Sequence, residues 1–150
     1  MMKTLALFIL ATCLYAAAAA QEPRRELQGT WQIVSYRFGD GISVGPRDAK
    51  RFVGRKILLS AKRAVSGREV CAQPTFESKR MDGDQFATEF RTSLKSIGIS
   101  AKDVELVEVQ CGGSDWLVPG STLIISKGET ISKGQTLTMW DGVFFVLKKR

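Results

Sequence analysis

The 150-residue sequence contains no histidine. Histidine is the most common general base near neutral pH, so serine–histidine hydrolase chemistry is excluded. The segment Gly112-Gly113-Ser114-Asp115-Trp116 has a serine after a glycine, but it lacks the second glycine of a Gly-x-Ser-x-Gly nucleophile elbow. Glu105 and Glu108 are the best candidates for an acid and base pair, and their spacing places them on opposite faces of one predicted strand. We therefore expect a protein that is not an enzyme.

Metal-binding patterns are also missing. The chain has three cysteines, whereas a structural zinc site needs four cysteine or histidine ligands. Asp82 and Asp84, followed by Glu89, depart from the spacing of a calcium-binding loop, and helix capping explains Asp84 better. We expect no bound metal and no cofactor.

After the first 20 residues, the sequence has no apolar run of the ~20 residues that a transmembrane helix requires. The first residues instead indicate a signal peptide over 1–20, because a lysine precedes an apolar stretch and a run of alanines suits cleavage after Ala20. The alternative is a lipoprotein in which Cys13 is lipidated, but Thr12 is unfavourable in front of that cysteine. We expect a periplasmic or secreted protein with no transmembrane segment.

Removal of the signal leaves residues 21–150, a length typical of one domain. Residues 21–27 are polar and indicate a flexible arm, so the domain itself is expected to cover 28–150. Cys71 and Cys111 are the two cysteines of the mature chain, and they lack the Cys-x-x-Cys spacing of a redox pair. An exported protein with an even number of cysteines is expected to join them in a structural disulfide.

Short runs of β-branched and aromatic residues indicate strands through most of this domain. The predicted strands are 30–38, 55–60, 64–66, 71–78, 104–111, 121–126, 136–140 and 143–150. Pro74 confines its segment to the start or edge of a strand. Asp141-Gly142 predicts a type I′ turn between the last two strands, because both central residues of that turn need positive φ. The expected fold is mostly β, with about eight antiparallel strands, each beside its neighbour in the chain.

Two segments have helical patterns. Apolar residues recur at helical spacing between 84 and 97, and Gly98 follows at the position where helices commonly end. We expect a helix over 84–97 whose apolar stripe packs on the outside of the sheet or across an opening. A shorter helix is predicted over 47–53, with Val53 among its inward-facing residues and Gly54 as its stop.

The first strand opens with Gly29-Thr30-Trp31, and the last ends with Lys148-Lys149-Arg150. A Gly-x-Trp at the start of the first strand and a basic end to the last strand resemble the signature of the lipocalins and the wider calycin superfamily. The resemblance implies an eight-stranded up-and-down barrel in which Trp31 plugs one end and a cation covers its indole. It makes Gly29, Trp31, Lys148 and Arg150 the expected structural signature, and it matches the short helix over 47–53 to one that commonly closes a barrel mouth.

Positive charge gathers between residues 47 and 68, where Asp48 is the single acid, and the chain carries a formal net charge of +7. Such a cluster is either a solvated face that aids solubility or an anion-binding surface. The candidate anion-binding or partner-binding residues are Arg47, Lys50, Arg51, Arg55, Lys56, Lys62 and Arg63. The cluster lacks the interleaved aromatics of a single-strand binder, so nucleic acid is an unexpected partner.

Trp116 is a further candidate, because a loop tryptophan beside glycines can anchor a partner or a sugar. Packing on its own barrel is the more frequent outcome for such a residue. Taken together, the sequence predicts a monomeric, non-catalytic binding protein that holds a small apolar or amphipathic ligand. The interior of an eight-stranded barrel is either filled by side chains or holds one small ligand, and the sequence does not distinguish the two cases. The alternative is an exported protein-interaction module or inhibitor that acts through its basic surface.

Overall fold

The structure is a computed structural model that describes residues 25–41, 44–127 and 134–150. The predicted signal peptide and most of the predicted arm over 21–27 lie outside the described residues. The strands are β1 (Gly29–Phe38), β2 (Lys56–Leu59), β3 (Arg63–Ser66), β4 (Glu69–Ala72), β5 (Thr75–Asp82), β6 (Asp103–Cys111), β7 (Ser114–Asp115), β8 (Thr122–Ser126), β9 (Gln135–Trp140) and β10 (Val143–Lys149). The helices are α1 (Pro46–Lys50) and α2 (Gly83–Phe90). No helix in these ranges is long and apolar enough to cross a membrane.

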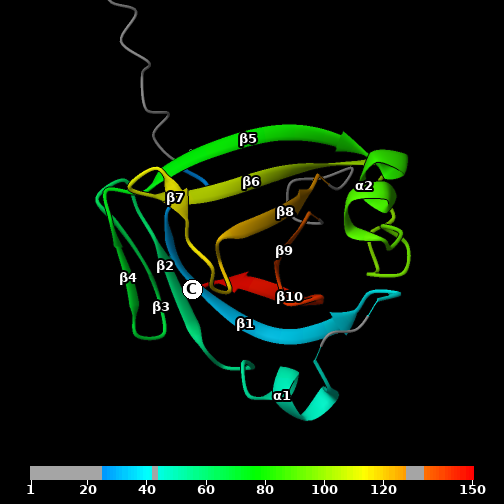
Figure 1. The fold of residues 1–150 in the computed structure, drawn as a ribbon, viewed down its shortest axis with the longest axis horizontal. Coiled ribbons are helices and arrows are strands. Elements are labelled where there is room, and N and C mark those ends of the chain that lie inside the picture. The colour runs from blue at the N-terminus through cyan, green and yellow to red at the C-terminus, as the bar shows by residue number, and fades with distance from the viewer. Residues whose placement is uncertain (1–24, 42–43, 128–133) are drawn as a thin grey trace, which may run out of the picture.

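Nine of the strands form one antiparallel sheet in the order β4-β3-β2-β1-β10-β9-β8-β6-β5, and β7 pairs with β6 alone. Figure 1 shows this sheet curled into a half-barrel whose two edges are β4 and β5. Most sheet neighbours are also chain neighbours, and the long-range exception is the pairing of β1 with β10. The predicted class, a mostly β fold built from one curled antiparallel sheet, is confirmed at this level.

The ten strands of the described residues exceed the prediction of about eight because the segment 71–78 is divided and because Ser114–Asp115 forms the unpredicted short strand β7. Gln73 adopts a positive φ of 52°, and Pro74 has no amide hydrogen to donate to a ladder, so the chain turns there. β4 ends before this pair and β5 begins after it. The predicted turn at Asp141 and Gly142 is confirmed, with φ values of 50° and 76° between β9 and β10.

Side chains alternate between the two faces of the sheet, and each face has its own core. In β10, Phe145 and Leu147 belong to the core on the concave face, whereas Phe144 belongs to the core on the convex face. The concave core also contains Trp31 and Trp116. β10 is apolar from Val143 to Leu147, because its side chains enter both cores.

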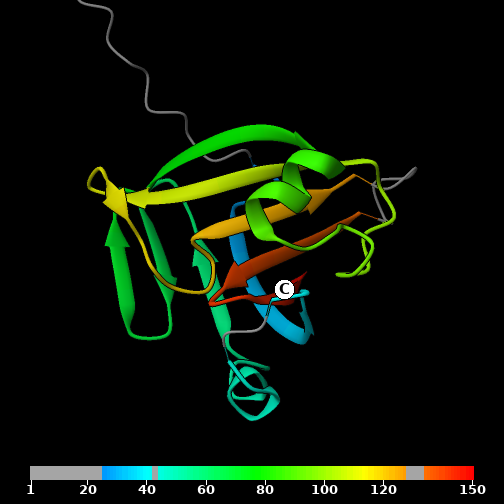
Figure 2. The same ribbon diagram turned by 45° about the vertical axis from the view of Figure 1, so that its right-hand side comes forward.

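α2 packs on the convex face, as the sequence predicts (Figure 2). Phe86 is fully buried there, with its ring centroid 6.2 Å from that of Phe144. The helix begins with a capping box: the Asp82 carboxylate accepts hydrogen bonds from the amides of Asp84 and Gln85, and the Gln85 side chain accepts from the Asp82 amide. The cap is thus Asp82 rather than Asp84.

The prediction that this helix extends to residue 97 is wrong. It ends at Phe90, because Arg91 adopts a left-handed conformation with a φ of 52°. The hydroxyl of Thr92 then donates to the Asp40 carboxylate at 3.0 Å, which draws the chain toward the end of β1. Gly98 does end a turn, with a φ of 75°, but the turn is a separate one. The early end of the helix is therefore accompanied by a hydrogen bond between distant segments, which the helical periodicity of the sequence does not predict.

α1 also differs from its predicted span of 47–53. It covers Pro46–Lys50 and buries Ala49, whereas Val53 is 40% exposed rather than inward-facing. After the helix the chain continues in tighter turns until Gly54, whose amide donates to the Ile33 carbonyl at 2.8 Å. That bond ties the end of the segment to β1.

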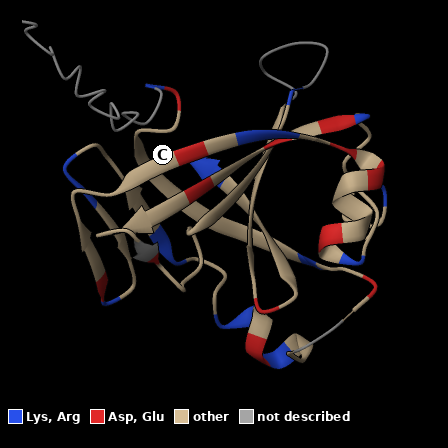
Figure 3. Cartoon of the chain, turned by 45° about the horizontal axis from the view of Figure 1, so that its top comes forward, with Lys and Arg blue, Asp and Glu red and all other residues tan. Residues whose placement is uncertain are grey.

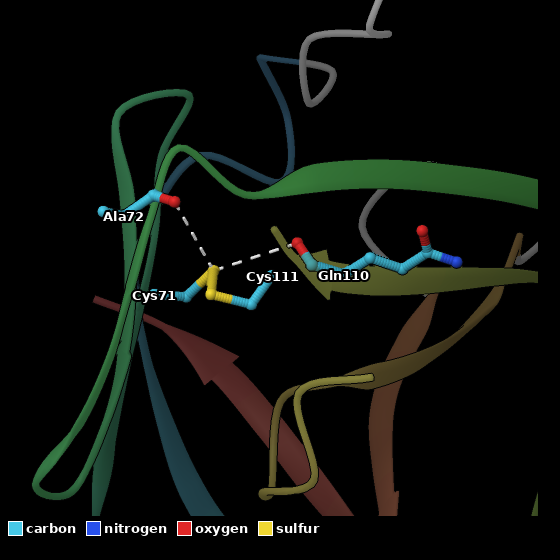
Figure 4. The surroundings of a disulfide bond; sticks show 4 residues. All are labelled: Cys71, Ala72, Gln110 and Cys111. Carbon is cyan, nitrogen blue, oxygen red and sulfur yellow. Dashed lines mark hydrogen bonds between the residues drawn. A yellow bond between two sulfur atoms is a disulfide. The ribbon is translucent and has the colours of Figure 1, made fainter. Parts of the chain in front are cut away.

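The disulfide between Cys71 and Cys111 is confirmed, with 5.5 Å between the two Cα atoms (Figure 4). Cys71 lies on the edge strand β4, and Cys111 ends β6 beside the start of the other edge strand, β5. The bond therefore joins the two edges of the curled sheet. In addition, the Cys71 sulfur lies 3.9 Å and 3.8 Å from the carbonyl oxygens of Ala72 and Gln110.

Trp31 lies in the concave core near the start of β1. Its indole Nε1 donates to the Leu27 carbonyl at 2.9 Å, and the ammonium of Lys149 lies 5.6 Å from the ring centroid. Lys149 also donates to the Glu26 carbonyl at 2.8 Å. Gly29 is required here, because it has a φ of 130° and an added Cβ would lie 3.0 Å from the Lys149 Cε atom.

A cation of the last strand does lie over the indole, and it is Lys149 rather than either of the expected signature residues Lys148 and Arg150. In the β1–β10 register Trp31 lies opposite Lys149, and Lys148 lies opposite Gln32. Alternation therefore places Lys148 on the other face of the sheet. Arg150 donates to the side chain of Gln32 instead.

Removing the disulfide tests its role in holding the sheet edges together. We expect the double variant C71A/C111A to lose about 2–4 kcal/mol of unfolding free energy, because the unfolded chain gains the freedom of a loop of about 40 residues. Urea unfolding of the variant and of the wild type measures the loss. The reduced wild-type protein is the control, because it lacks the disulfide bond but keeps both sulfur atoms. Equal unfolding free energies of the oxidised and reduced wild-type protein would contradict the expectation.

Lys149→Met keeps most of the side-chain length but removes the charge above Trp31 and the hydrogen bond to Glu26. We expect it to lower the unfolding free energy by about 1 kcal/mol, within the range for a cation–π contact. Lys148→Met is the matched control, since that residue faces away from the indole. Equal losses of unfolding free energy in the two variants would show that removal of one positive charge, rather than loss of the indole contact, lowers the stability.

Candidate functional site: a basic cleft at the end of β2 and β3

A cleft of about 1180 Å³ opens where β2 begins and β3 ends. Its walls come from the start of β2, the hairpin between β3 and β4, the loop 117–119 and the segment that follows α1. The lining of the cleft includes residues from the concave and the convex face of the sheet. The cleft therefore extends around the strand ends from one face to the other. The lining consists of Thr30, Ile33, Phe52, Gly54, Arg55, Lys56, Leu58, Arg63, Val65, Ser66, Gly67, Arg68, Glu69, Val70, Leu117, Val118, Pro119 and Trp140.

Its convex wall is an apolar row across adjacent strands. Leu58 of β2 lies opposite Val65 of β3, which lies opposite Val70 of β4, and Thr30 of β1 continues the row on the other side. These side chains face outward because their strand neighbours, such as Ile57, fill the concave core. Val70 is 63% exposed, which is unusual for a residue of its size and hydrophobicity.

The concave wall is aromatic. The ring centroid of Phe52 lies 5.1 Å from that of Trp140 and 5.2 Å from that of Phe145. Phe145 is fully buried, whereas Phe52 and Trp140 are half-buried and line the cleft. The aromatic surface is thus anchored to the concave core.

The loop 117–119 is held against the sheet by specific contacts. The Ser66 hydroxyl donates to the Pro119 carbonyl at 2.6 Å, and the Gly120 amide donates to the Thr138 hydroxyl at 2.7 Å. Gly120 has a φ of 106°, and an added Cβ would lie 2.8 Å from a methyl carbon of Ile57. Glycine therefore permits the close approach that brings this loop to the cleft.

Four cations and one acid line the cleft. The cations are Arg55, Lys56, Arg63 and Arg68, and the acid is Glu69. None of the four cations forms an ion pair with a carboxylate within the described part of the chain. Their charges therefore remain available to an anion.

Arg55 has the most defined position of these cations. Its guanidinium carbon lies 4.3 Å from the ring centroid of Phe52, and its Nε donates to the Arg51 carbonyl at 3.1 Å. Backbone hydrogen bonds hold the residue at both sides, from its amide to the Phe52 carbonyl and from the Ile33 amide to its own carbonyl. The guanidinium is thus oriented by its neighbours rather than by an acid.

The structure separates the predicted basic residues into two groups. Arg55, Lys56 and Arg63 line the cleft. The remaining four do not line it: Arg47 and Lys50 lie in α1, Arg51 follows it and forms a 3.5 Å ion pair with Asp48, and Lys62 lies in the β2–β3 turn. Figure 3 shows both signs of charge on α1 and acidic residues on α2.

Trp116 is not an exposed anchor, because its side chain is only 7% exposed and packs in the concave core. Pairing of β7 with β6 brings this residue over the concave face. Its indole Nε1 has no hydrogen-bond partner among the described residues. The next residue, Leu117, is instead 79% exposed and lines the cleft.

Several residues of the cleft are missing from the sequence-based candidates. Arg68 lies just beyond the basic residues that the sequence singles out, and its position in the short hairpin between β3 and β4 is the signal that points to it. Phe52 and Trp140 are far apart in the sequence, and nothing in the pattern of either predicts that they meet. The exposure of Val70 and Leu117 depends on the twist of the hairpin and the loop, which the sequence does not reveal.

The described residues bring together neither the carboxylates of Glu105 and Glu108 nor a group of metal ligands. Glu105 and Glu108 lie on opposite faces of β6, since Val107 and Val109 face the concave core and Leu106 the convex one. No three acidic or cysteine side chains of the described residues lie close enough to hold a metal ion. The cleft is thus the feature that carries a functional argument.

The fold and the cleft together define a β half-barrel protein with a basic, partly aromatic cleft on its flank. Scans of protein families, curated proteins and solved structures found no match to this chain.

Unpaired cations that share a cleft repel one another, so they contribute little to stability. We expect Arg68→Gln to leave the melting temperature unchanged or to raise it slightly at low salt. Arg80→Gln is the comparison, because Arg80 forms a 2.7 Å ion pair with Asp103 that raises its pKa above the ordinary value. That variant should melt slightly lower than the wild type. A fall of several degrees for Arg68→Gln in a thermal scan would show that the residue is structural.

Proposed function

We propose that this protein is a non-catalytic binding protein of lipocalin-like architecture that holds a small apolar or amphipathic ligand in the cleft. One observation carries the proposal: a cleft of about 1180 Å³ is lined by aromatic and aliphatic side chains next to unpaired cations. Small-molecule sites commonly have volumes of about 300–1,000 Å³ and mostly apolar walls with a few polar groups. The cleft is slightly larger, and nine of its eighteen lining residues are apolar.

Exposed apolar side chains at the rim support a ligand rather than a solvated face. Val70 is 63% exposed and Leu117 is 79% exposed, and both line the cleft. Large apolar side chains gathered at one place on a surface commonly indicate a binding site. A basic face that served solubility alone would not need them.

Two features support the lipocalin-like part of the proposal. Trp31 lies near the start of the first strand under a cation of the last strand, and successive strands are mostly neighbours in the sheet. One feature departs from a closed barrel: β4 and β5 end the sheet, and the disulfide spans the two edges. A disulfide also suits an oxidising compartment, which supports the proposed periplasmic or secreted location.

An uncharged fluorescent probe tests the apolar part of the site. We expect N-phenyl-1-naphthylamine to bind the wild type saturably and to fluoresce more strongly when bound. The double variant V70S/L117S should bind it roughly tenfold more weakly, because two apolar contacts of about 0.5–1 kcal/mol each are lost. Val34→Ser is the control, since Val34 is 40% exposed and does not line the cleft.

The same titration distinguishes the alternative, a protein-interaction module that acts through its basic surface. That alternative needs no apolar site, so it predicts no saturable binding of the probe. Absence of saturable binding by the wild type, or equal weakening by V70S/L117S and V34S, would contradict the proposed function.

A further inference from the structure

We propose that the ligand of this cleft is an amphiphile with an oxyanion head group, and that Arg55 binds the head group. The inference rests on the proposed function and adds the chemical class of the ligand. It places the ligand on the flank of the half-barrel, outside the filled concave core. The head group is a carboxylate or a phosphate, which share two adjacent oxygens that accept hydrogen bonds.

The geometry of Arg55 supports this assignment. Its guanidinium lies over Phe52, and its Nε is used in the hydrogen bond to the Arg51 carbonyl. Its two terminal nitrogens form no hydrogen bond with any described residue. Those nitrogens are the pair that binds two oxygens of a carboxylate or phosphate at once. Because stacking already orders the side chain, less conformational entropy is lost when an anion binds.

The charge around Arg55 favours an anion as well. Lys56, Arg63 and Arg68 line the same cleft, and Glu69 is the single acid among its lining residues. Apolar walls lower the local dielectric constant and concentrate the field of these charges. An anion in the cleft therefore reduces the mutual repulsion of the four cations. A neutral ligand would leave that repulsion in place.

The apolar part of the ligand follows from the position of Phe52. One side chain, Phe52, is the stacking partner of Arg55 and also contacts Trp140, with 5.1 Å between the ring centroids. A head group on Arg55 is thus adjacent to the aromatic surface and to Val118 beyond it. An amphiphile occupies both parts, whereas inorganic phosphate occupies the charged part alone. We therefore expect inorganic phosphate to bind far more weakly than an amphiphile.

Calorimetric titration of the disulfide-bonded protein tests the inference with three probes below their aggregation concentrations: dodecanoate, dodecyl phosphate and dodecanol. We expect both anions to bind at least tenfold more tightly than dodecanol at 0.15 M salt. Arg55→Gln should weaken the binding of the anions about tenfold or more and leave dodecanol unchanged. Arg55→Lys keeps the charge and loses the paired donors, so it should give an intermediate affinity.

Lys50→Gln is the matched control, because it removes one positive charge from α1 outside the cleft lining. It should change the affinity for dodecanoate by less than twofold. Equal effects of Lys50→Gln and Arg55→Gln would overturn the inference, since they would show long-range attraction without a defined site. Thermal scans of both variants establish that each is folded.

The outcomes separate this inference from the proposed function. If dodecanol and the two anions bind equally, the inference is overturned and the proposed function stands. If none of the three probes binds, the inference is overturned, and the proposed function fails with it when N-phenyl-1-naphthylamine does not bind either. A further arm uses vesicles of phosphatidylglycerol and phosphatidylcholine: binding to these vesicles without binding of the dissolved amphiphiles would indicate a membrane surface and would overturn the inference.

Discussion

The pairing of β1 with β10 is the interaction on which the rest of the structure depends. β1 to β4 form one meander and β5 to β10 form another, and only this pairing joins them within one sheet. It also brings Lys149 over Trp31, so the two ends of the domain meet at one place. The contact is long-range in sequence, and its formation fixes the position of every other strand relative to the first.

The unequal lengths of neighbouring strands create the cleft. β10 pairs with β1 from Trp31 to Phe38, whereas β2 pairs only with Gly29 to Gln32. The remaining part of β1 has no strand on its other side within the described sheet, and the segment after α1 forms two backbone hydrogen bonds with Ile33 at the start of that part. That segment places Phe52 and Arg55 beside the loop 117–119, where a longer β2 would have excluded both.

The disulfide and the two cores stabilise the curled shape in different ways. Apolar burial on both faces favours compactness but does not dictate where the sheet must close. Cys71 and Cys111 join the edges at one point and leave the strands beyond it free to diverge. Near the cleft, the hydrogen bond from the Ser66 hydroxyl to the Pro119 carbonyl joins the loop 117–119 to β3.

The features that the sequence by itself determined are those that depend on residues close together in the chain. The positive φ values at Asp141 and Gly142, the strand alternation and an amphipathic helix at the position of α2 follow from local composition, and the disulfide between Cys71 and Cys111 agrees with its prediction. The tertiary structure decided the rest. Register selected Lys149 as the cation over Trp31, and a hydrogen bond between Thr92 and Asp40 accompanies the early end of α2. Three-dimensional packing likewise buried Trp116, exposed Leu117 and brought Arg55 onto Phe52, because these outcomes depend on contacts between segments that sequence periodicity does not encode.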